Sequence, residues 1–222
     1  MSNIKYIDMK LLELFSGTKS IGKIFEENGC ETVSVDINPK ANPDICCDIL
    51  ELDYKSLWKP NDFDVIWTSP PCTEYSAMRN ISISKGGRPR NLELANKIVL
   101  KTFEIIEYLQ PKFWFMENPD SGLLKNQEFM KDIPFVRTDY CKYGYPYRKR
   151  TRFWGSVEGL KLQMCKYDCK ATDDSGNKHI TSIGSHRKEG HNQDRSTLNQ
   201  RFSIPPDLCR EFYNHCINQS NL

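Results

Sequence analysis

Three short apolar runs that stop abruptly at turn-forming residues constrain the fold of this 222-residue chain more than any other feature. They cover Lys10–Phe15, Phe63–Thr68 and Phe113–Met116, and each is followed within three residues by Gly or Pro. Continuous apolar runs of this kind are typical of strands buried on both faces of a parallel sheet. Helical patterns separate the runs, so residues 1–155 predict an α/β fold with a Rossmann-like, mostly parallel sheet covered by helices on both faces.

Other segments complete this alternation of strands and helices. Ile21, Ile24 and Phe25 recur at helical spacing before a stop at Asn28 and Gly29. Further strands are predicted at Thr32–Val35, Phe135–Tyr140 and Thr151–Trp154, and further helices at Leu92–Leu109 and Asp207–Asn218. The polar segment from Cys72 to Arg90, which contains Gly86, Gly87 and Pro89, is predicted to be a mobile lid loop.

The pattern divides the chain into three parts. We expect residues 1–155 to form the main domain, residues 156–200 a small irregular polar insert, and residues 201–222 a C-terminal segment that returns to the core. The length allows one sizeable α/β domain with a small appendage.

Composition excludes several classes of protein. No apolar run approaches the about 18 residues that span a bilayer, and the N-terminus lacks the pattern of a secretory signal. We therefore expect an intracellular protein, in which nine cysteines are free, metal-bound or catalytic rather than paired in disulfides. The net charge is only +2, but basic residues cluster in Arg79–Arg90 and Arg137–Arg152. These clusters are either phosphate contacts or an ordinary solvated surface.

Candidate cofactor residues follow the first two strands. Gly17 lies where the chain leaves a strand and enters a helix, which is a usual position for a cofactor loop. Lys19 occupies the second glycine position of a dinucleotide fingerprint, so phosphate binding at this loop is weakly supported. Asp36 ends the second strand, where acidic residues commonly accept hydrogen bonds from ribose hydroxyls. The alternative is that Asp36 is a turn residue that caps Asn38.

Candidate catalytic residues follow the next two strands. Cys72 comes directly after two prolines that fix the backbone at the sheet's carboxyl edge, which suits a nucleophile. The alternative is a small buried hydrophobic residue, because a reactive thiolate also needs nearby positive charge. Glu117 and Asn118 end the next strand at the same edge and converge on Cys72. The alternative for Glu117 is a cap on a helix that starts near Asp120.

Two arginines precede a β-type aromatic pair. Arg150 and Arg152 are separated by one residue, so strand geometry would place them on the same side. There they would grip a base or a phosphate. The alternative is a solvated basic edge strand.

Taken in order along the chain, these segments resemble the cytosine carbon-5 DNA methyltransferase family. Pro71, Cys72, Tyr75 and Ser76 resemble its P-C-Q-x-F-S motif, Glu117 and Asn118 its E-N-V motif, and Arg150 and Arg152 its Q-x-R-x-R motif. The segment IPPDL near the end resembles a return segment of compact phage and viral members. The chain departs from these motifs at several positions: Lys19 and Ser20 replace glycines, Thr73 replaces glutamine and Pro119 replaces valine. Tyr147 stands in the glutamine position of the last motif, with one extra residue before Arg150. In addition, the insert of residues 156–200, which stands in the place of a target-recognition region, is much smaller than the usual target-recognition domain.

The resemblance implies an S-adenosylmethionine-dependent methyltransferase that acts on a flipped-out cytosine. The thiolate of Cys72 would attack carbon 6, Glu117 would protonate N3, Asn118 would help to position the base, and Arg150 or Arg152 would hold the base carbonyl. The implied cofactor residues are Phe15, Ser16, Gly17, Thr18, Asp36, Ile37, Asp48, Ile49, Ser69 and Pro70. No catalytic metal is implied.

The same resemblance implies double-stranded DNA as the partner, without a membrane or an obligate protein partner. The setting would be the cytoplasm of a bacterium or of a phage- or virus-infected cell, as in restriction–modification. Three alternatives stay open: methylation of RNA such as tRNA, amino methylation of adenine or cytosine, and an inactive DNA-binding regulator. Intact Cys72, Glu117, Arg150 and Arg152 argue against the last.

The polar insert contains a second cluster of reactive residues. Cys165, Cys169, His179, His186 and His191 have a spacing from which tetrahedral zinc ligands could be drawn. A C-x3-C pair with irregularly spaced histidines is less specific than paired C-x2-C motifs. Ordinary free residues are the favoured interpretation, with structural zinc as the alternative.

Overall fold

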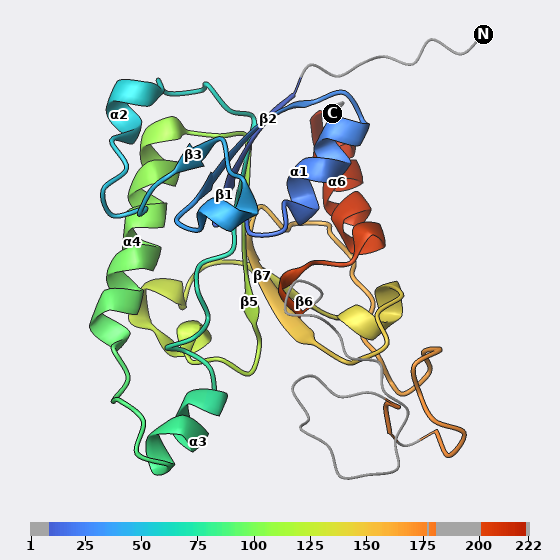
Figure 1. Cartoon of the computed structure of the whole chain (residues 1–222). Helices are drawn as coiled ribbons and strands as arrows, with labels where there is room; N and C mark the ends of the chain where they lie inside the picture. Colours follow the sequence, from blue (N-terminus) through green and yellow to red (C-terminus); the bar gives the residue numbers. More distant parts are fainter. Residues whose placement is uncertain (1–8, 177, 181–200, 221–222) are drawn as a thin grey trace, which may run out of the picture.

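A computed structural model describes residues 9–176, 178–180 and 201–220, and it shows a seven-stranded sheet flanked by helices (Figure 1). The strands are β1 (Lys10–Leu14), β2 (Glu31–Asp36), β3 (Ile45–Cys46), β4 (Val65–Thr68), β5 (Phe113–Pro119), β6 (Phe135–Asp139) and β7 (Arg150–Gly155). The helices are α1 (Ser20–Glu27), α2 (Tyr54–Leu57), α3 (Met78–Ser84), α4 (Leu92–Leu109) and α6 (Pro206–Ser220). Four 3₁₀ turns are η1 (Pro39–Ala41), η2 (Leu124–Asn126), η3 (Glu128–Met130) and η4 (Tyr140–Tyr143).

The sheet has the order β3-β2-β1-β4-β5-β7-β6. The first five strands run parallel, whereas β7 is antiparallel to both of its neighbours, β5 and β6. The predicted α/β class and the mostly parallel sheet are therefore confirmed. The carboxyl ends of β1, β2, β4 and β5 meet at one edge of the sheet, and the start of β7 lies at the same edge because that strand runs the opposite way.

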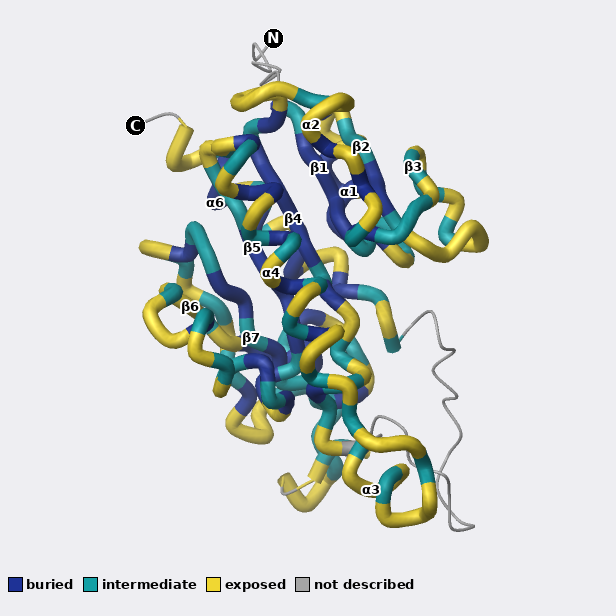
Figure 2. Tube along the Cα trace, turned by 90° about the vertical axis from the view of Figure 1, so that its left-hand side faces the viewer, coloured by how far each residue is buried: buried dark blue, intermediate teal, exposed yellow. Residues whose placement is uncertain are grey.

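Because side chains alternate along each strand, apolar residues pack into two layers, one on each face of the sheet. Leu11 of β1 packs under α1 and α6, whereas Leu12 and Leu14 face α4 on the opposite side of the sheet. Figure 2 shows β1, β4 and β5 as the buried centre between these layers. Both faces of the sheet are covered, as the unbroken apolar runs predict.

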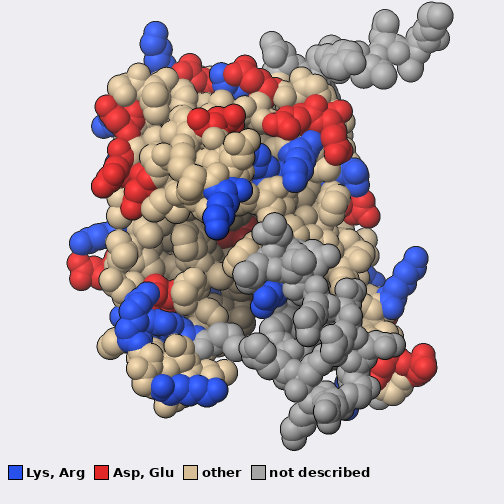
Figure 3. All heavy atoms as spheres, in the orientation of Figure 1, with Lys and Arg blue, Asp and Glu red and all other residues tan. Residues whose placement is uncertain are grey.

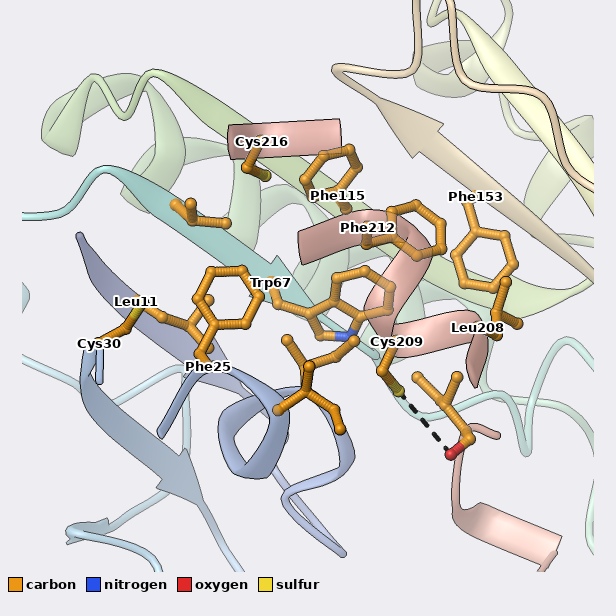
Figure 4. Packing of buried hydrophobic residues seen from close by; sticks show 14 of the residues in the cluster. Leu11, Phe25, Cys30, Trp67, Phe115, Phe153, Leu208, Cys209, Phe212 and Cys216 are labelled. Atoms are coloured by element: carbon orange, nitrogen blue, oxygen red, sulfur yellow. Dashed lines mark hydrogen bonds between the residues drawn. The ribbon is translucent and has the colours of Figure 1, made fainter. Parts of the chain in front are cut away.

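Aromatic residues dominate the layer between the sheet and α6 (Figure 4). The ring of Phe212 lies 4.9 Å from that of Trp67, 5.0 Å from that of Phe115 and 4.8 Å from that of Phe153. Burial of each such ring contributes about 2–3 kcal/mol relative to leaving it exposed. The C-terminal helix is thus an integral part of the core.

The structure agrees with the sequence prediction for the long helix α4 and differs from it in short elements. Helix α4 has the predicted bounds of Leu92–Leu109, with Asn91 accepting a hydrogen bond from the Leu94 N–H at 3.0 Å as its N-cap. The short elements β3 and α2 were not predicted, because two and four residues carry too little periodicity. The segment predicted as a loop contains the helix α3.

Within the described part of the chain, none of the helices combines the length and the apolar character that a bilayer span requires.

Candidate active site

The loop after β1 is a tight reversal held by a buried carboxyl group. Phe15, Gly17 and Lys19 all have positive φ angles, of 57°, 47° and 52°. Glu13 of β1 accepts hydrogen bonds from the N–H groups of Ile21 and Gly22, at 3.2 and 3.0 Å. These groups belong to the first turn of α1 and have no partner within the helix, so Glu13 takes the place of an N-cap.

Burial raises the pKa of Glu13 to about 7, against the opposing effect of the two backbone hydrogen bonds. A side chain at Gly22 would place its Cβ only 2.8 Å from the Glu13 carboxylate, so a larger residue there would shift this carboxylate. Sequence reasoning missed Glu13. The signal was an acidic residue inside an otherwise apolar strand that is buried on both faces.

Asp36 joins the ends of β1 and β2. One of its carboxylate oxygens accepts the Gly17 N–H at 2.8 Å, and the other accepts the Asn38 N–H at 2.7 Å. The interpretation of Asp36 as a turn residue that caps Asn38 is therefore confirmed. Asp36 also fixes the loop after β1 through Gly17. Next to it, the apolar side chain of Ile37 is 65% exposed, which leaves an apolar surface at the same edge.

Two buried hydroxyl groups at this edge have no hydrogen-bond partner among the described residues. They are Ser16 Oγ, beyond the end of β1, and Thr68 Oγ1, at the end of β4, whose residue pairs with Leu14 in the sheet. An unpaired buried hydroxyl costs about 1–3 kcal/mol, so such groups are typical of a place that a polar ligand fills. In contrast, Ser69 Oγ accepts a hydrogen bond from Trp67 Nε1 at 3.0 Å.

The remaining predicted cofactor residues line the same edge. Asp48 lies two residues beyond β3 and accepts the Leu50 N–H at 3.0 Å, while Ile49 is buried in the core below α4. Thr18 Oγ1 lies 2.7 Å from Ser20 Oγ, which in turn accepts the Ile204 N–H at 3.1 Å. The C-terminal segment therefore contacts the loop after β1.

Cys72 follows β4 and is half-buried. Asn118, fully buried at the end of β5, donates from Nδ2 to the Pro70 carbonyl oxygen at 2.9 Å and so ties the turn before Cys72 to β5. Burial raises the pKa of the Cys72 thiol, the charge of Glu117 raises it further, and the charge of Lys149 lowers it. The resting cysteine is therefore a thiol beside one acidic and one basic group.

Glu117, Lys149 and Tyr140 form a compact group next to Cys72. Lys149 Nζ lies 3.6 Å from Glu117 Oε1, and the Tyr140 hydroxyl donates to the same oxygen at 3.2 Å. Lys149 also lies 4.8 Å from the centre of the Tyr140 ring. Neither Lys149 nor Tyr140 was selected from the sequence, although Lys149 belongs to the basic run that suggested the two arginines.

The two predicted arginines are each engaged with an aspartate. Arg150 forms a two-point pair with Asp139, at 3.0 and 2.9 Å. Arg152 Nε donates to Asp120 Oδ1 at 2.8 Å, and its guanidinium stacks 3.9 Å from the centre of the Phe135 ring. Among the described residues, Lys149 is the cation whose charge lowers the pKa of the Cys72 thiol.

The segment after Cys72 is organised by Glu74. Its carboxylate pairs with Arg88 and Arg79 and accepts the Asn91 N–H at 2.8 Å. Arg90 donates to the Ser76 carbonyl at 2.8 Å. The basic residues predicted to contact phosphates therefore also hold their own segment together, and Figure 3 shows Lys and Arg side chains gathered at its lower left, over α3.

Tyr75 anchors this segment to the body of the protein. Its ring is completely buried, and its hydroxyl donates to Asn96 Oδ1 at 2.8 Å on α4. The Leu123 N–H donates to the Tyr75 carbonyl at 2.9 Å. The turn that carries Cys72 is thus fixed on one side by Asn118 and on the other by Tyr75.

Known proteins with similar sequences belong to one family. Residues 9–147 match the family model of the C-5 cytosine-specific DNA methylases. The chain is 36% identical over 224 aligned positions to the "Probable DNA (cytosine-5)-methyltransferase" of Frog virus 3 (isolate Goorha), covering 94% of this chain and all of the viral protein. It is 25% identical to the "Type II methyltransferase M.AgeI" of Thalassovita gelatinovora over 69% of this chain, which corresponds to only 41% of that enzyme.

Among solved structures, the methyltransferase EhMeth of Entamoeba histolytica is similar in fold, with a TM-score of 0.51 and 20% sequence identity. The similarity covers 71% of this chain and 56% of that one. The family model spans more than half of the chain, and the viral relative matches nearly all of it. This chain is a member of the C-5 cytosine-specific DNA methylase family.

Proposed function

We propose that this protein transfers a methyl group from S-adenosylmethionine to carbon 5 of a cytosine in double-stranded DNA, through a covalent adduct at Cys72. The observation that supports this most is the group of Cys72, Glu117 and Lys149 at the carboxyl edge of a methyltransferase-type sheet. A thiol, a carboxyl group and an ammonium group together supply a nucleophile, a proton donor and a compensating charge.

The residues at the ends of β1 and β2 fit the cofactor. Asp36 retains unused lone pairs for ribose hydroxyls, Ile37 offers an apolar surface, and the unpaired hydroxyls of Ser16 and Thr68 are buried at the strand ends between this surface and Cys72. Phe15, Gly17, Thr18, Asp48, Ile49, Ser69 and Pro70 complete the proposed binding set. When bound, S-adenosylmethionine supplies an electrophilic methyl group.

The protein's own residues make carbon 5 reactive. The Cys72 thiol passes its proton to the Glu117 carboxylate as its sulfur forms a bond to carbon 6 of the cytosine, and Lys149 stabilises the developing thiolate. Glu117 binds the N3 edge and delivers a proton there, so the electron pair displaced from the double bond is directed to carbon 5. After methylation, a water molecule takes the carbon-5 proton, and the electron pair left on carbon 5 reforms the double bond to carbon 6. The carbon–sulfur bond breaks with its electron pair going to the Cys72 sulfur, and the N3 proton returns to Glu117.

Carbon 6 of a stacked base is out of reach of a thiol at a sheet edge, so the cytosine must leave the helix. Extrusion of a base costs a few kcal/mol, which contacts with the pocket and the phosphates must offset. Arg150 and Arg152 lie on β7 beside Asn118, where their guanidinium groups can exchange an aspartate for the base carbonyl or a phosphate.

The decisive experiment measures transfer of labelled methyl groups to duplex DNA and to tRNA in parallel, with mapping of the modified base. We expect 5-methylcytosine in DNA and none in tRNA. Cys72→Ala should lose at least about 10³-fold in turnover while still binding S-adenosylmethionine. Retained activity in this variant would overturn the covalent mechanism, and labelling of tRNA alone would replace DNA as the substrate.

A covalent trap tests the same step directly. Duplex DNA that carries 5-fluorocytosine cannot lose a proton from carbon 5, so the adduct should persist and shift the protein in a denaturing gel. Cys72→Ala should give no shifted band, whereas the exposed Cys46→Ser should behave as the native protein.

A further inference from the structure

A second cluster of reactive side chains lies outside the candidate active site. The Sγ atoms of Cys141, Cys165 and Cys169 and a ring nitrogen of His179 all lie within 4.8 Å of one another. His179 Nε2 is 3.4 Å from Cys165 Sγ and 3.4 Å from Cys169 Sγ. In tetrahedral zinc sites with bonds of about 2.3 Å to sulfur and about 2.0 Å to nitrogen, sulfur and nitrogen ligands lie about 3.5 Å apart. The two sulfur–nitrogen distances match such a tetrahedron, and the other ligand atoms lie close enough to join it.

The ligands come from two separate parts of the chain. Cys141 belongs to η4, next to β6, while Cys165, Cys169 and His179 belong to the polar segment that follows β7. The three cysteines are free thiols, and Cys141 and Cys165 are buried. Three thiols and an imidazole around one point have no packing advantage in a segment with few apolar residues, whereas they are a preferred ligand set for zinc.

The surroundings of the sulfur atoms resemble those of metal-bound thiolates. The Tyr167 N–H donates to Cys165 Sγ at 3.3 Å, from a residue with a positive φ of 64° that turns the chain between the two cysteines. Thr172 Oγ1 lies 3.3 Å from Cys169 Sγ. The Tyr167 ring packs 5.3 Å from the His179 ring and fixes its orientation. Hydrogen bonds of this kind orient metal ligands and offset thiolate charge.

We propose that Cys141, Cys165, Cys169 and His179 bind one structural Zn²⁺ ion. Four protein ligands fill a tetrahedral coordination sphere, so the site has no open position for catalysis. Its role is to join the segment after β7 to η4, which a polar segment without its own core requires.

The proposed site also contacts the end of β6, and through it the start of β7. The Cys165 N–H donates to Asp139 Oδ2 at 3.0 Å, and Asp139 pairs with Arg148 and Arg150 on either side of Lys149. The metal would therefore hold in place the segment that presents Lys149 to Cys72. Figure 1 shows the segment around residues 160–176 lying beside η4 and the end of β6.

The ligand set differs from the sequence-based alternative. Cys141 was not among the candidates, because it lies 24 residues before Cys165 in a different motif. His186 and His191 lie outside the described residues and are not needed to complete the four ligands. This difference provides matched controls.

The test is the metal content of untagged protein purified under reducing conditions and measured by mass spectrometry of the elements. We expect about one zinc per chain. Cys165→Ser and His179→Ala should lose most of the metal, whereas His186→Ala, His191→Ala and Cys46→Ser should retain it. Zinc near zero in the native protein, or metal loss in His186→Ala with retention in His179→Ala, would overturn the proposal.

A spectroscopic measurement does not depend on whether the variants fold. Native protein exchanged with Co²⁺ should show the strong visible absorption of tetrahedral cobalt and a thiolate-to-cobalt charge-transfer band. Weak absorption typical of octahedral cobalt would contradict the Cys3His assignment. Because this readout needs no DNA and no S-adenosylmethionine, its outcome is independent of the proposed methyltransferase activity.

Discussion

The two halves of the sheet's carboxyl edge are held together in different ways. At β1 and β2, carboxylates accept main-chain N–H groups: Glu13 those of α1, and Asp36 those of Gly17 and Asn38. At β5 and β7, the charged groups pair side chain to side chain, as Lys149 does with Glu117. Main-chain partners fix a shape before the ligand arrives, whereas paired side chains can exchange partners when it does. The first half suits a cofactor, and the second suits a base that must be moved and protonated.

Removal of the charge at Lys149 should have the largest effect, because the β5–β7 half depends on it. We expect Lys149→Ala to lower kcat by about 10²–10³-fold, since the Cys72 thiolate and Glu117 both lose their compensating charge. Lys149→Arg should recover part of the loss. The exposed Lys112→Ala, whose partner Asp64 lies at the other edge, is the matched control. Full activity in Lys149→Ala would refute the role of this half.

Glu13 makes the β1–β2 half sensitive to pH. Its pKa rises from the ordinary 4.5 to about 7 on folding, so the folded state holds the proton more tightly. The contribution of this shift to the free energy of unfolding is fully present below about pH 4.5 and is lost as the pH rises through about 7. The total contribution is at most about 3 kcal/mol. Glu13→Gln cannot titrate and should lack this slope.

Urea unfolding of both proteins from pH 4.5 to 8 checks this expectation. The unfolding free energy of Glu13→Gln relative to the native protein should rise with pH up to about 7 and then level off. Subtracting the two curves removes the titration of other groups, such as Asp44, whose pKa is lowered by its hydrogen bond to Ser34. A difference that does not change with pH would exclude Glu13 as the source.

Asp36 should affect binding without affecting chemistry. Asp36→Ala leaves the Gly17 and Asn38 N–H groups without their acceptor and removes the proposed ribose contact. We expect affinity for S-adenosylmethionine to fall about 10-fold or more, with kcat at saturating cofactor nearly unchanged. Calorimetry and steady-state kinetics would measure the two quantities. Asp53→Asn, at the N-cap of α2, is the control, and an equal loss in kcat would show that the two halves do not act separately.

The sequence predicted the parts of this molecule that follow from continuous patterns. The buried strands, the bounds of α4 and the position of Cys72 beyond β4 all follow from apolar runs that end in prolines or other turn residues. The place of β7 between β5 and β6 did not follow, because local patterning does not encode strand order. Without that order, neither the contact of Lys149 with Glu117 nor that of Cys141 with Cys165 could be read from the chain.

The smallest expected effect concerns the segment after Cys72, which lies beyond both halves. The side chain of Arg88 is 61% exposed, whereas that of Arg79 is 13% exposed, and both pair with Glu74. Only Arg88 is therefore free to exchange its partner for a phosphate. We expect Arg88→Ala to weaken duplex DNA binding a few-fold and to lower the slope of log affinity against log salt by about one.

Arg79→Ala should leave that salt slope unchanged, because Arg79 also donates to the Arg88 carbonyl at 2.8 Å and to the Pro89 carbonyl at 3.2 Å within its own segment. Its effect should instead be on turnover, through loss of order next to Cys72. DNA titrations at several salt concentrations separate the two variants. If both changed the slope equally, the segment would act as one phosphate-binding surface, and the distinction between an internal arginine and an exposed one would fail.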